Sequence, residues 1–533
     1  MFFLFVFSVF SLNGFGQQSN SLFYKSFDEP VALTKELQRA KEAVQNDNSL
    51  LGVYSPAYCQ GLKGKALDLT ANVPLRIPFG LNKNERPAYD EFSSFSLQIW
   101  VRTLEKAPQG TPIMTNKKSN DNESAGWCIG TKENGSWYWN MSDGESRYNY
   151  EPTWQRQAIN DGKWHQITVS FDRSKKEVWF YFDGQNVAVY QVQGIKSLES
   201  ELRTVLGGSD EYHDWGSRGE WMAFNGMVDE VRLWNKSLTA KEVHESYELF
   251  FPAKPQPQTA PEKLKVQVWN IWHGGHRFGQ NVGVERTIEI LKRENADIIG
   301  LVETYGSGAI IADSLGYHFY LISTNLSIMS RYPIEETIQL FKPFNSGGAL
   351  IDLGENQKIA FFDIWLHYLP DACDLVKGKS VVEEFLKQEQ NSRLTELAAI
   401  LKDINSRTNS ADKIPVLVVG DFNTDSHLDW TEENKAMHNG LVIDFPVSRL
   451  MEKAGYTDSF RKLHPKVSQY PGITWSPLIN PVSKTPDCLP CRIDFIYYKG
   501  SKLQPYRSET LNRHPVFWPS DHASVVSSFY LSK

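Results

Sequence analysis

The sequence has little cysteine, no net positive charge and no apolar run long enough for a membrane. The formal net charge is −7, so no overall basic field draws the chain to nucleic acid, although a bound metal ion can supply positive charge locally. The apolar run 2–12 has 11 residues, whereas a membrane-spanning helix needs ~20. With 41% hydrophobic and 22% charged residues, the composition excludes a largely disordered chain and a multi-span membrane protein.

The five cysteines are an odd number, so at least one lies outside an intramolecular disulfide. Cys488 and Cys491 form a CxxC sequence. Zinc would need a second ligand pair, and a redox CxxC usually opens a helix, whereas this one precedes a strand-like run. We therefore expect a local disulfide between Cys488 and Cys491, and a second disulfide could join Cys59 to Cys128.

The N-terminal apolar run has the length of the core of a secretory signal peptide. Gly14 and Gly16 give a small-x-small cleavage pattern, which predicts a signal peptide over residues 1–16, although no Lys or Arg precedes the run. A buried N-terminal strand is the alternative. We expect a secreted, periplasmic or cell-surface protein without a stable membrane span, and a monomer.

The 533 residues predict two or three domains. Residues 17–49 include a leading helix over 29–47, where apolar residues recur at helical spacing. Residues 50–251 contain short alternating runs, such as 96–101 and 165–171, separated by Asn-Gly and Asp-Gly turns. This pattern, together with 13% aromatic residues, predicts an all-β antiparallel sandwich or jelly roll.

A proline-rich segment marks the clearest boundary, because four prolines fall between Pro252 and Pro261. Residues 252–262 are therefore expected to form a semi-rigid linker. Strands and helices alternate through residues 263–533, which predicts a layered α/β domain. We expect strands at 264–270, 298–302, 358–366, 416–419, 492–498 and 524–530, and helices at 284–294 and 381–401.

Two segments of the first domain carry a specific pattern, Asp161–Ser170 (DGKWHQITVS) and a second segment over residues 224–243 (FNGMVDEVRLWNKSLTAKEV). Together they resemble laminin-G/concanavalin A-like jelly rolls. The resemblance implies a β-sandwich that often binds glycans or proteins, sometimes through Ca²⁺. Acidic residues near Asp210 or Asp229 are candidates for Ca²⁺ binding, although Asp229 is as easily a turn or salt-bridge residue.

Tryptophans of the first domain divide into expected core residues and candidates for exposure. Trp164, Trp179 and Trp234 occupy alternating strand positions, which indicates the core rather than a sugar-binding face. Trp137 and Trp139 are flanked by turns and are the better candidates for exposed rings.

Polar residues stand at the ends of four predicted strands in the second domain. A polar residue after a strand is usually a cap or turn former, so each alone is weak evidence. Their combination at neighbouring strand ends makes an oxygen-rich site suited to a hard cation such as Mg²⁺. In chain order these residues are Asn270, Glu303, Asp421, Asn423, Asp521 and His522.

Three further motifs accompany these residues, Tyr456–Arg461 (YTDSFR), Ile473–Trp475 (ITW) and Arg492–Phe495 (RIDF). With them, residues 263–533 resemble the endonuclease/exonuclease/phosphatase superfamily, which includes DNase I, AP endonucleases, sphingomyelinases and inositol polyphosphate 5-phosphatases. The resemblance implies two β-sheets flanked by helices, a four-layer α/β sandwich. It also implies hydrolysis of phosphate esters with a divalent metal.

By the same resemblance, Glu303 is the principal ligand of Mg²⁺, with Mn²⁺ as the alternative ion. Asn270 lies beside it and holds phosphate or a metal-bound water, and Asp521 lies at the metal or next to its ligands. Asp421 orients or deprotonates the attacking water, and Asn423 holds that water or a phosphate oxygen.

The resemblance also assigns two histidines. His522 donates to a phosphoryl oxygen, and Asp494 bonds its other ring nitrogen and keeps it protonated, because a nearby carboxylate raises the pKa of a histidine. His367 falls where DNase-like members place a second histidine. AP-endonuclease-like members carry an Asp two residues after the Asn, where this chain has Trp272, which disfavours a role in DNA repair.

The sequence thus predicts a secreted phosphoric ester hydrolase, more narrowly a phosphodiesterase, whose jelly roll binds a glycan or a surface. No Lys/Arg cluster lies near the motifs, so a lipid or polyol headgroup is a slightly better substrate than nucleic acid. The loop 273–277 (HGGHR) either grips substrate, with Arg277 on a phosphate, or is a solvated turn. The alternatives are a secreted nuclease and a non-catalytic glycan-binding protein with an inactive hydrolase domain.

Overall fold

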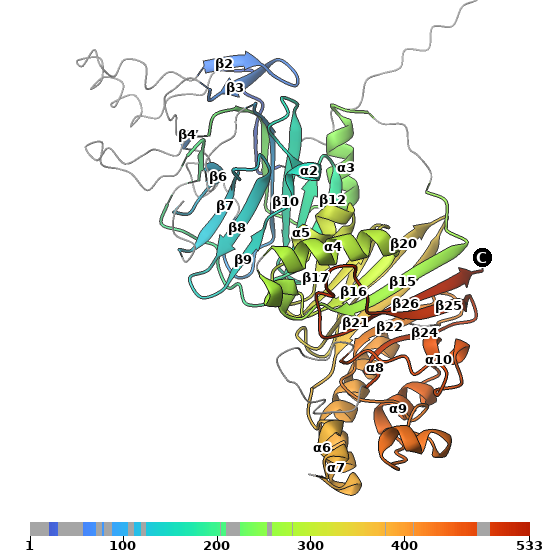
Figure 1. Ribbon diagram of the computed structural model, residues 1–533. Helices are drawn as coiled ribbons and strands as arrows, with labels where there is room; N and C mark the ends of the chain where they lie inside the picture. The colour runs from blue at the N-terminus through green and yellow to red at the C-terminus, as the bar shows by residue number, and fades with distance from the viewer. Residues whose placement is uncertain are drawn as a thin grey trace, which may run out of the picture. The chain divides into compact units, whose positions relative to one another are not determined.

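The computed structural model describes residues 21–29, 57–70, 77–78, 88–104, 111–118, 124–202, 204–208, 224–252, 258–279, 281–378, 380–408, 410–476 and 491–532. They form two compact units, the first mostly up to Pro252 and the second mostly from Ala253 onward (Figure 1). The expected signal peptide and nearly all of the expected leading helix lie outside the described residues. Within the described part, no helix is both long and apolar enough to cross a membrane.

The first unit is an antiparallel β-sandwich, which confirms the predicted fold class. One sheet has the order β2-β3-β14-β5-β10-β11, with β1 paired to β14. The other has the order β4-β13-β6-β7-β8-β9. The strands are β1 (Phe23–Lys25), β2 (Ala57–Gln60), β3 (Lys65–Asp68), β4 (Ile77–Pro78), β5 (Phe95–Arg102), β6 (Pro112–Thr115), β7 (Gly126–Thr131), β8 (Trp137–Ser142), β9 (Arg147–Tyr150), β10 (His165–Asp172), β11 (Glu177–Phe182), β13 (Val205–Leu206) and β14 (Met227–Trp234).

Aromatic rings fill the space between these two sheets. Phe180 on β11 lies 4.7 Å from the ring of Tyr150 and 6.3 Å from that of Trp139. Trp137 and Trp139 are fully buried, so the expectation that they are exposed is wrong. Both face the opposite sheet, where burying their large rings stabilises the sandwich. Among the tryptophans expected in the core, Trp234 is buried, whereas Trp164 and Trp179 are partly exposed.

The helix α3 (Ala240–Glu248) covers the outer face of the first sheet. It begins with a capping box, in which Thr239 and Glu242 satisfy each other's backbone amides. The ring of Tyr247 then stacks on Trp100 of β5, with centroids 5.5 Å apart. The outer face of β5 is therefore buried as well as its inner face.

Asp229, a candidate for Ca²⁺ binding, has a structural role in this unit. Its carboxylate accepts hydrogen bonds from the backbone amides of Leu62 and Glu230, both within 2.9 Å. It is fully buried, and burial raises its pKa to about 7. Asp210 lies outside the described residues.

The second unit contains two mixed sheets, which confirms the predicted DNase I-like sandwich. One sheet has the order β12-β17-β18-β16-β15-β26-β25, where β12 is Gln185–Gln191, and the other has the order β19-β20-β21-β22-β24-β23. The parallel pairs are β12 with β17 and β15 with β16 in the first, and β21 with β22 in the second. The strands are β15 (Lys263–Asn270), β16 (Ile298–Val302), β17 (His318–Leu321), β18 (Leu326–Ser330), β19 (Ile334–Gln339), β20 (Ser346–Gly354), β21 (Gln357–Trp365), β22 (Val416–Asp421), β23 (Thr457–Asp458), β24 (Asp494–Lys499), β25 (Leu503–Leu511) and β26 (Ser524–Leu531).

Helices α8 (Thr395–Arg407) and α9 (Pro446–Lys453) cover the outer face of the second of these sheets (Figure 1). Leu397 and Ile400 of α8, with Met451 of α9, pack against Phe362 of β21 and Val418 of β22. The single helix expected over 381–401 is in fact α7, a π-helical turn and α8. The helices are α4 (Val282–Glu294), α5 (Gly308–Leu315), α6 (Ala372–Val376), α7 (Val382–Glu389), α8 (Thr395–Arg407), α9 (Pro446–Lys453) and α10 (Ser459–Leu463), with the π turn η3 (Gln390–Leu394) and the 3₁₀ turns η2 (His273–Phe278) and η4 (Glu432–His438).

The inner faces of the two sheets approach closely at Gly300 of β16. A Cβ atom there would lie 2.8 Å from the side chain of Val419 and 3.0 Å from that of Asp363, both on the opposite sheet. Only glycine fits this approach. The approach brings the strand ends of the two sheets together at one edge.

The cysteines differ from both expected pairings. Cys491 is a buried thiol rather than half of a disulfide, so the predicted CxxC disulfide is wrong. Its side chain points into the core beside Asp425. Cys59 on β2 and Cys128 on β7 are also thiols, so the second possible disulfide is not formed. Cys373 is disulfide-bonded, and Cys488 lies outside the described residues.

Candidate active site

The strand directions bring the predicted polar residues to one edge of the second unit. Asn270 ends β15, and Glu303 directly follows β16, which runs parallel to it. Asp421 ends β22 and lies opposite Asp494, the first residue of the antiparallel β24. His522 precedes β26, which runs antiparallel to β15. The carboxyl ends of β15, β16 and β22 therefore lie beside the amino ends of β24 and β26.

Asn270 connects the two sheets. Its Nδ2 donates to Glu303 Oε1 and to Asp421 Oδ2, each at 3.2 Å. Its Oδ1 accepts from the backbone amide of Trp272 at 3.0 Å. The side chain is buried, so these contacts fix Glu303 and Asp421 relative to one another.

Glu303 is held by an unusual turn of the backbone. It has a φ of 57°, and the four residues 272–275 also have positive φ values. The amide of His273 donates to Glu303 Oε2 at 2.8 Å, and that of Gly274 donates to the Glu303 carbonyl at 2.7 Å. Such conformations are costly for residues other than glycine and cluster at functional sites. The η2 turn thus aims the Glu303 carboxylate at the site.

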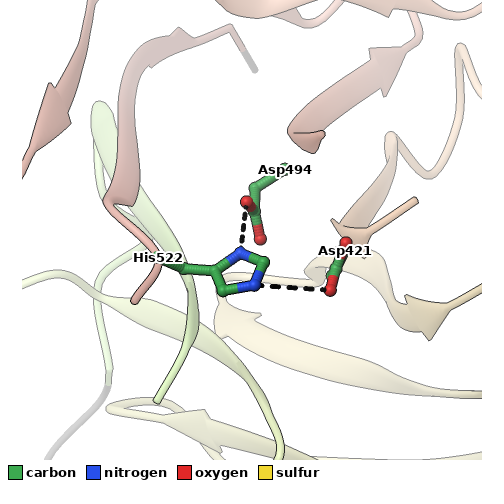
Figure 2. A group of neighbouring side chains, drawn as sticks. All are labelled: Asp421, Asp494 and His522. Carbon is green, nitrogen blue, oxygen red and sulfur yellow. Dashed lines mark hydrogen bonds and ion pairs between the residues drawn. The ribbon is translucent and has the colours of Figure 1, made fainter. Parts of the chain in front are cut away.

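His522 lies between two carboxylates (Figure 2). Its Nδ1 is 2.9 Å from Asp494 Oδ2, and its Nε2 is 4.0 Å from Asp421 Oδ2. Burial opposes a charge on this ring, but Asp494 and then Asp421 outweigh it and raise the pKa of His522 to about 10. Burial, with the nearby Asp494, raises the pKa of Asp421 to about 7. The pair therefore combines a charged imidazolium with a carboxylate that can accept a proton near neutral pH.

The donor set fits a hard divalent cation. Asp521 Oδ1 is buried and makes no hydrogen bond within the described residues, and burial raises the pKa of this carboxyl. With Glu303 and Asn270, it offers the oxygen ligands that Mg²⁺ and Mn²⁺ prefer. Ligand atoms of Asp421, Asp494 and His522 also lie within 4.8 Å of one another. We assign that group to the imidazolium instead, because a protonated histidine has no lone pair for a metal.

Asn423 and His367 complete the predicted set, with different outcomes. The Asn423 amide donates to Asp421 Oδ1 at 2.9 Å, and its side chain donates to the Leu366 carbonyl at 2.9 Å. His367 is set apart, because its ring stacks on Tyr368 and its Nδ1 accepts from the Leu369 amide at 3.1 Å. It does not line the cavity that contains Glu303, Asp421, Asn423, Asp521 and His522.

Arg393 is a site residue that the sequence analysis missed. It lies in the π turn η3 with its side chain buried, and it lines the same cavity. Its Nη atoms donate to the carbonyls of Asn423 and Pro370, and its Nε pairs with Glu389 at 3.5 Å. The signal was a Glu and an Arg four residues apart within a segment that otherwise reads as a buried helix.

Residues of the three accompanying motifs hold the strand that carries Asp494. Arg492 donates to Asp429 at 2.8 Å and to Asp458 at 2.7 Å, and all three side chains are buried. Thr474 Oγ1 accepts from the amide of Asp494 at 3.1 Å. Because buried charges need such pairing, these motifs fix the strand that presents Asp494.

The comparisons agree with this geometry. Residues 268–522 match the Endonuclease/Exonuclease/phosphatase family. This match confirms the resemblance of the second unit, and every predicted site residue lies within the matched range. Residues 83–244 match the Concanavalin A-like lectin/glucanases superfamily, as the resemblance of the first unit implied.

Individual proteins match parts of the chain. The "Uncharacterized protein F14F9.5" of Caenorhabditis elegans is 27% identical over 293 residues, which cover 50% of this chain and 91% of that protein. The "Non-toxic nonhemagglutinin" of Paraclostridium bifermentans is 31% identical over 113 residues, 21% of this chain but only 9% of that protein.

Two solved structures are similar over half of the chain. Truncated Caenorhabditis elegans TDP2 is 16% identical with a TM-score of 0.36, and the match covers 50% of this chain and 98% of that one. An AP endonuclease from Archaeoglobus fulgidus is 17% identical with a TM-score of 0.36, over 50% of this chain and 99% of that one.

Proposed function

We propose that the second unit is a Mg²⁺-dependent phosphodiesterase, with Mn²⁺ as the alternative ion. The observation that carries this proposal is the row of contacts from Glu303 through Asn270 and Asp421 to His522. It joins an oxygen-rich cation site to a charged imidazolium within one cavity.

The side chains suit hydrolysis by an attacking water. Asp421 accepts the proton of that water, whose oxygen forms the new bond to phosphorus while the bond to one alcohol oxygen breaks. The departing alkoxide takes a proton from solvent water, and Asp421 returns its proton to solvent. His522 donates to a phosphoryl oxygen as negative charge develops on it. The cation, held by Glu303, Asp521 and Asn270, supplies charge neutralisation when bound.

The electrostatics of the cavity support a need for that cation. Asp371, Asp425 and Asp521 line it together with Glu303 and Asp421, so an anionic phosphodiester meets strong repulsion in the absence of a divalent ion. An inactive hydrolase domain has no reason to keep buried carboxylates so close together, since each costs free energy when desolvated. A nuclease is the alternative activity, but the scarcity of Lys and Arg near the site motifs favours a substrate with a compact headgroup.

The first unit is proposed to tether the enzyme to a glycan or another surface. The support is its match to the Concanavalin A-like lectin/glucanases superfamily. Secretion to the cell exterior or periplasm, with the N-terminal apolar run as signal, and a monomeric state complete this proposal. Glycan-array binding by the purified protein tests the tether; the absence of any glycan signal above background contradicts it.

The activity is tested with the full-length protein on bis-p-nitrophenyl phosphate, sphingomyelin, inositol phosphates and plasmid DNA, each with Mg²⁺ and with EDTA. We expect metal-dependent turnover that is lost in His522→Gln. His514→Gln is the matched control, because His514 pairs with Glu289 and does not line the cavity. Metal-dependent cleavage of DNA alone would make the protein a nuclease, and no turnover on any substrate would leave only the binding role.

A further inference from the structure

The cavity extends well beyond the groups that the reaction uses. Its volume is about 400 Å³, within the range of small-molecule sites. The catalytic side chains line only part of it. The remainder, here called the side chamber, is lined by aromatic rings and hydrogen-bond acceptors, chiefly Trp365, Tyr368, Trp475, Asp371, Thr424 and Asp425.

Two of the aromatic residues have contacts that position them. The Trp365 backbone exchanges hydrogen bonds with Asn345, at 2.8 Å to its carbonyl and 3.0 Å from its side-chain amide. The Trp365 ring also meets that of Phe344 edge-on, with centroids 5.6 Å apart. Tyr368 stacks on His367 at 4.9 Å while remaining 58% exposed. The side chamber therefore offers flat apolar faces that need little ordering on binding.

The polar side chains that line the side chamber offer mainly hydrogen-bond acceptors. The Thr424 hydroxyl donates to Glu389, so its lone pairs remain as acceptors. The Asp425 carboxyl is buried, and burial raises its pKa to about 7. Asp371 Oδ1 accepts from the Cys373 amide at the start of α6. Such groups are suited to receive hydroxyl donors from a ligand.

Positive charge in the side chamber is limited to one side chain whose donors are already used. Among the described residues that line the cavity, Arg393 is the one Lys or Arg. Both of its Nη atoms donate to backbone carbonyls, those of Asn423 and Pro370. A second anionic group of the substrate thus finds no unpaired cation among the described lining residues, which disfavours polyanionic substrates.

We propose that the side chamber binds a sugar ring that forms one alcohol of the phosphodiester. The apolar face of such a ring packs on Trp365, Tyr368 or Trp475, while its hydroxyls donate to Asp371, Thr424 and Asp425. An acyl chain would desolvate these polar groups without replacing their hydrogen bonds. An ammonium headgroup is the competing occupant, because aromatic rings also bind such cations, and the test below includes it. This inference rests on the proposed phosphodiesterase activity and specifies its substrate class.

The test uses p-nitrophenyl phosphodiesters whose second alcohol is glucose, ethanol, choline or thymidine. We expect the full-length protein with Mg²⁺ to show a kcat/KM for the glucosyl ester at least about tenfold above that for the ethyl ester. Tyr368→Ala and Asp425→Asn should reduce this ratio to about one to three. Tyr530→Ala is the matched control, because Tyr530 is 46% exposed on β26 and does not line the cavity.

The outcomes separate this inference from the proposed activity. Metal-dependent turnover of all four esters at similar kcat/KM values overturns the sugar preference and leaves the phosphodiesterase intact. A preference for the thymidine or the choline ester overturns it in favour of a nucleotide or an ammonium headgroup. No turnover of any ester overturns both. Because Tyr368 is exposed, its alanine variant is expected to fold and decides the question if Asp425→Asn does not.

Discussion

Each of the two units buries an acidic residue whose pKa is raised to about 7, yet the two residues have opposite surroundings. In the first unit, Asp229 accepts from two backbone amides, and the neighbouring Glu230 accepts from Tyr24 and Arg232. In the second, Asp421 faces Asp494, whose Oδ1 makes no hydrogen bond within the described residues.

The difference teaches that a raised pKa alone does not mark a functional acid. Burial is the first cause of the shift at both Asp229 and Asp421. Both carboxylates also accept two hydrogen bonds. What distinguishes Asp421 is its acidic neighbours, because Asp494 Oδ1 and Asp521 Oδ1 are buried and make no hydrogen bond within the described residues. Native structures satisfy nearly all buried polar groups, so these two oxygens support the proposed binding of a cation and a phosphate there.

The largest effect is expected at His522. The substitution His522→Gln should lower kcat/KM on bis-p-nitrophenyl phosphate by roughly 10²–10⁴, the range typical of general acid–base groups. The Asp229→Asn variant should leave the same kinetic constants unchanged. Steady-state assays with saturating Mg²⁺ measure both. Equal losses in the two variants would break the contrast between the units.

A pH effect is expected at Asp494. Its carboxylate holds the pKa of His522 near 10 and helps to raise that of Asp421 to about 7, so the wild-type rate should rise through pH 7 and fall as pH increases toward 10. In Asp494→Asn both limbs should move to lower pH, because the imidazolium loses its stabilising partner and Asp421 loses a like charge. A pH–rate profile with an unmoved alkaline limb would contradict the assigned role.

The same pKa shifts predict a stability change of known sign. The folded-state pKa of His522 is raised above the ordinary value of 6.5, so its contribution to stability is fully present below that pH and is lost as pH rises through about 10. For Asp421, raised from 3.8 to about 7, the loss occurs at lower pH but in the same direction. Chemical denaturation of the metal-free protein between pH 5 and pH 10 measures this loss. In Asp494→Asn, the alkaline loss should be smaller and complete at lower pH, because the folded-state pKa of His522 falls while its unfolded-state pKa is unchanged.

The fold class followed from the sequence because its signals are local. Alternating runs and Asp-Gly turns mark the sandwich, and strand–helix alternation after Pro252 marks the α/β unit. Polar residues at strand ends, such as Glu303 and Asp421, were also visible. Their convergence depends on parallel and antiparallel pairing between distant strands, which the family resemblance supplied rather than any local pattern.

Other features were inaccessible because they depend on three-dimensional packing. The turns around Trp137 and Trp139 suggested exposure, but the opposite sheet covers both rings. The CxxC spacing suggested a local disulfide, but Cys491 points into the core. Arg393 carried no motif, since its partners are backbone carbonyls of segments that are remote in sequence.

A stability test in the first unit examines the structural role of Asp229, in contrast to the proposed catalytic role of Asp421. Asp229→Ala leaves the amides of Leu62 and Glu230 without their acceptor, which should destabilise the unit by about 1–3 kcal/mol for each amide. Urea denaturation should therefore show a lower free energy of unfolding, while turnover by the second unit stays unchanged. A variant as stable as the wild type would mean that Asp229 is not the structural acid described here.

The smallest effect concerns Asp363, the fully buried carboxyl on β21 that lies one row behind Asp421 in the sheet. Neither of its oxygens has a hydrogen-bond partner among the described residues, and burial raises its pKa well above the ordinary value. If carboxylate oxygens without hydrogen bonds are needed only at the active site, those of Asp363 have no function, because Asp363 does not line the cavity. Asp363→Leu, of similar size, should then raise the free energy of unfolding by about 1 kcal/mol without changing kcat/KM. A loss of activity in a stable Asp363→Leu variant would instead extend the functional group of acids one row deeper, since it would show that this carboxyl acts on Asp421 through the sheet.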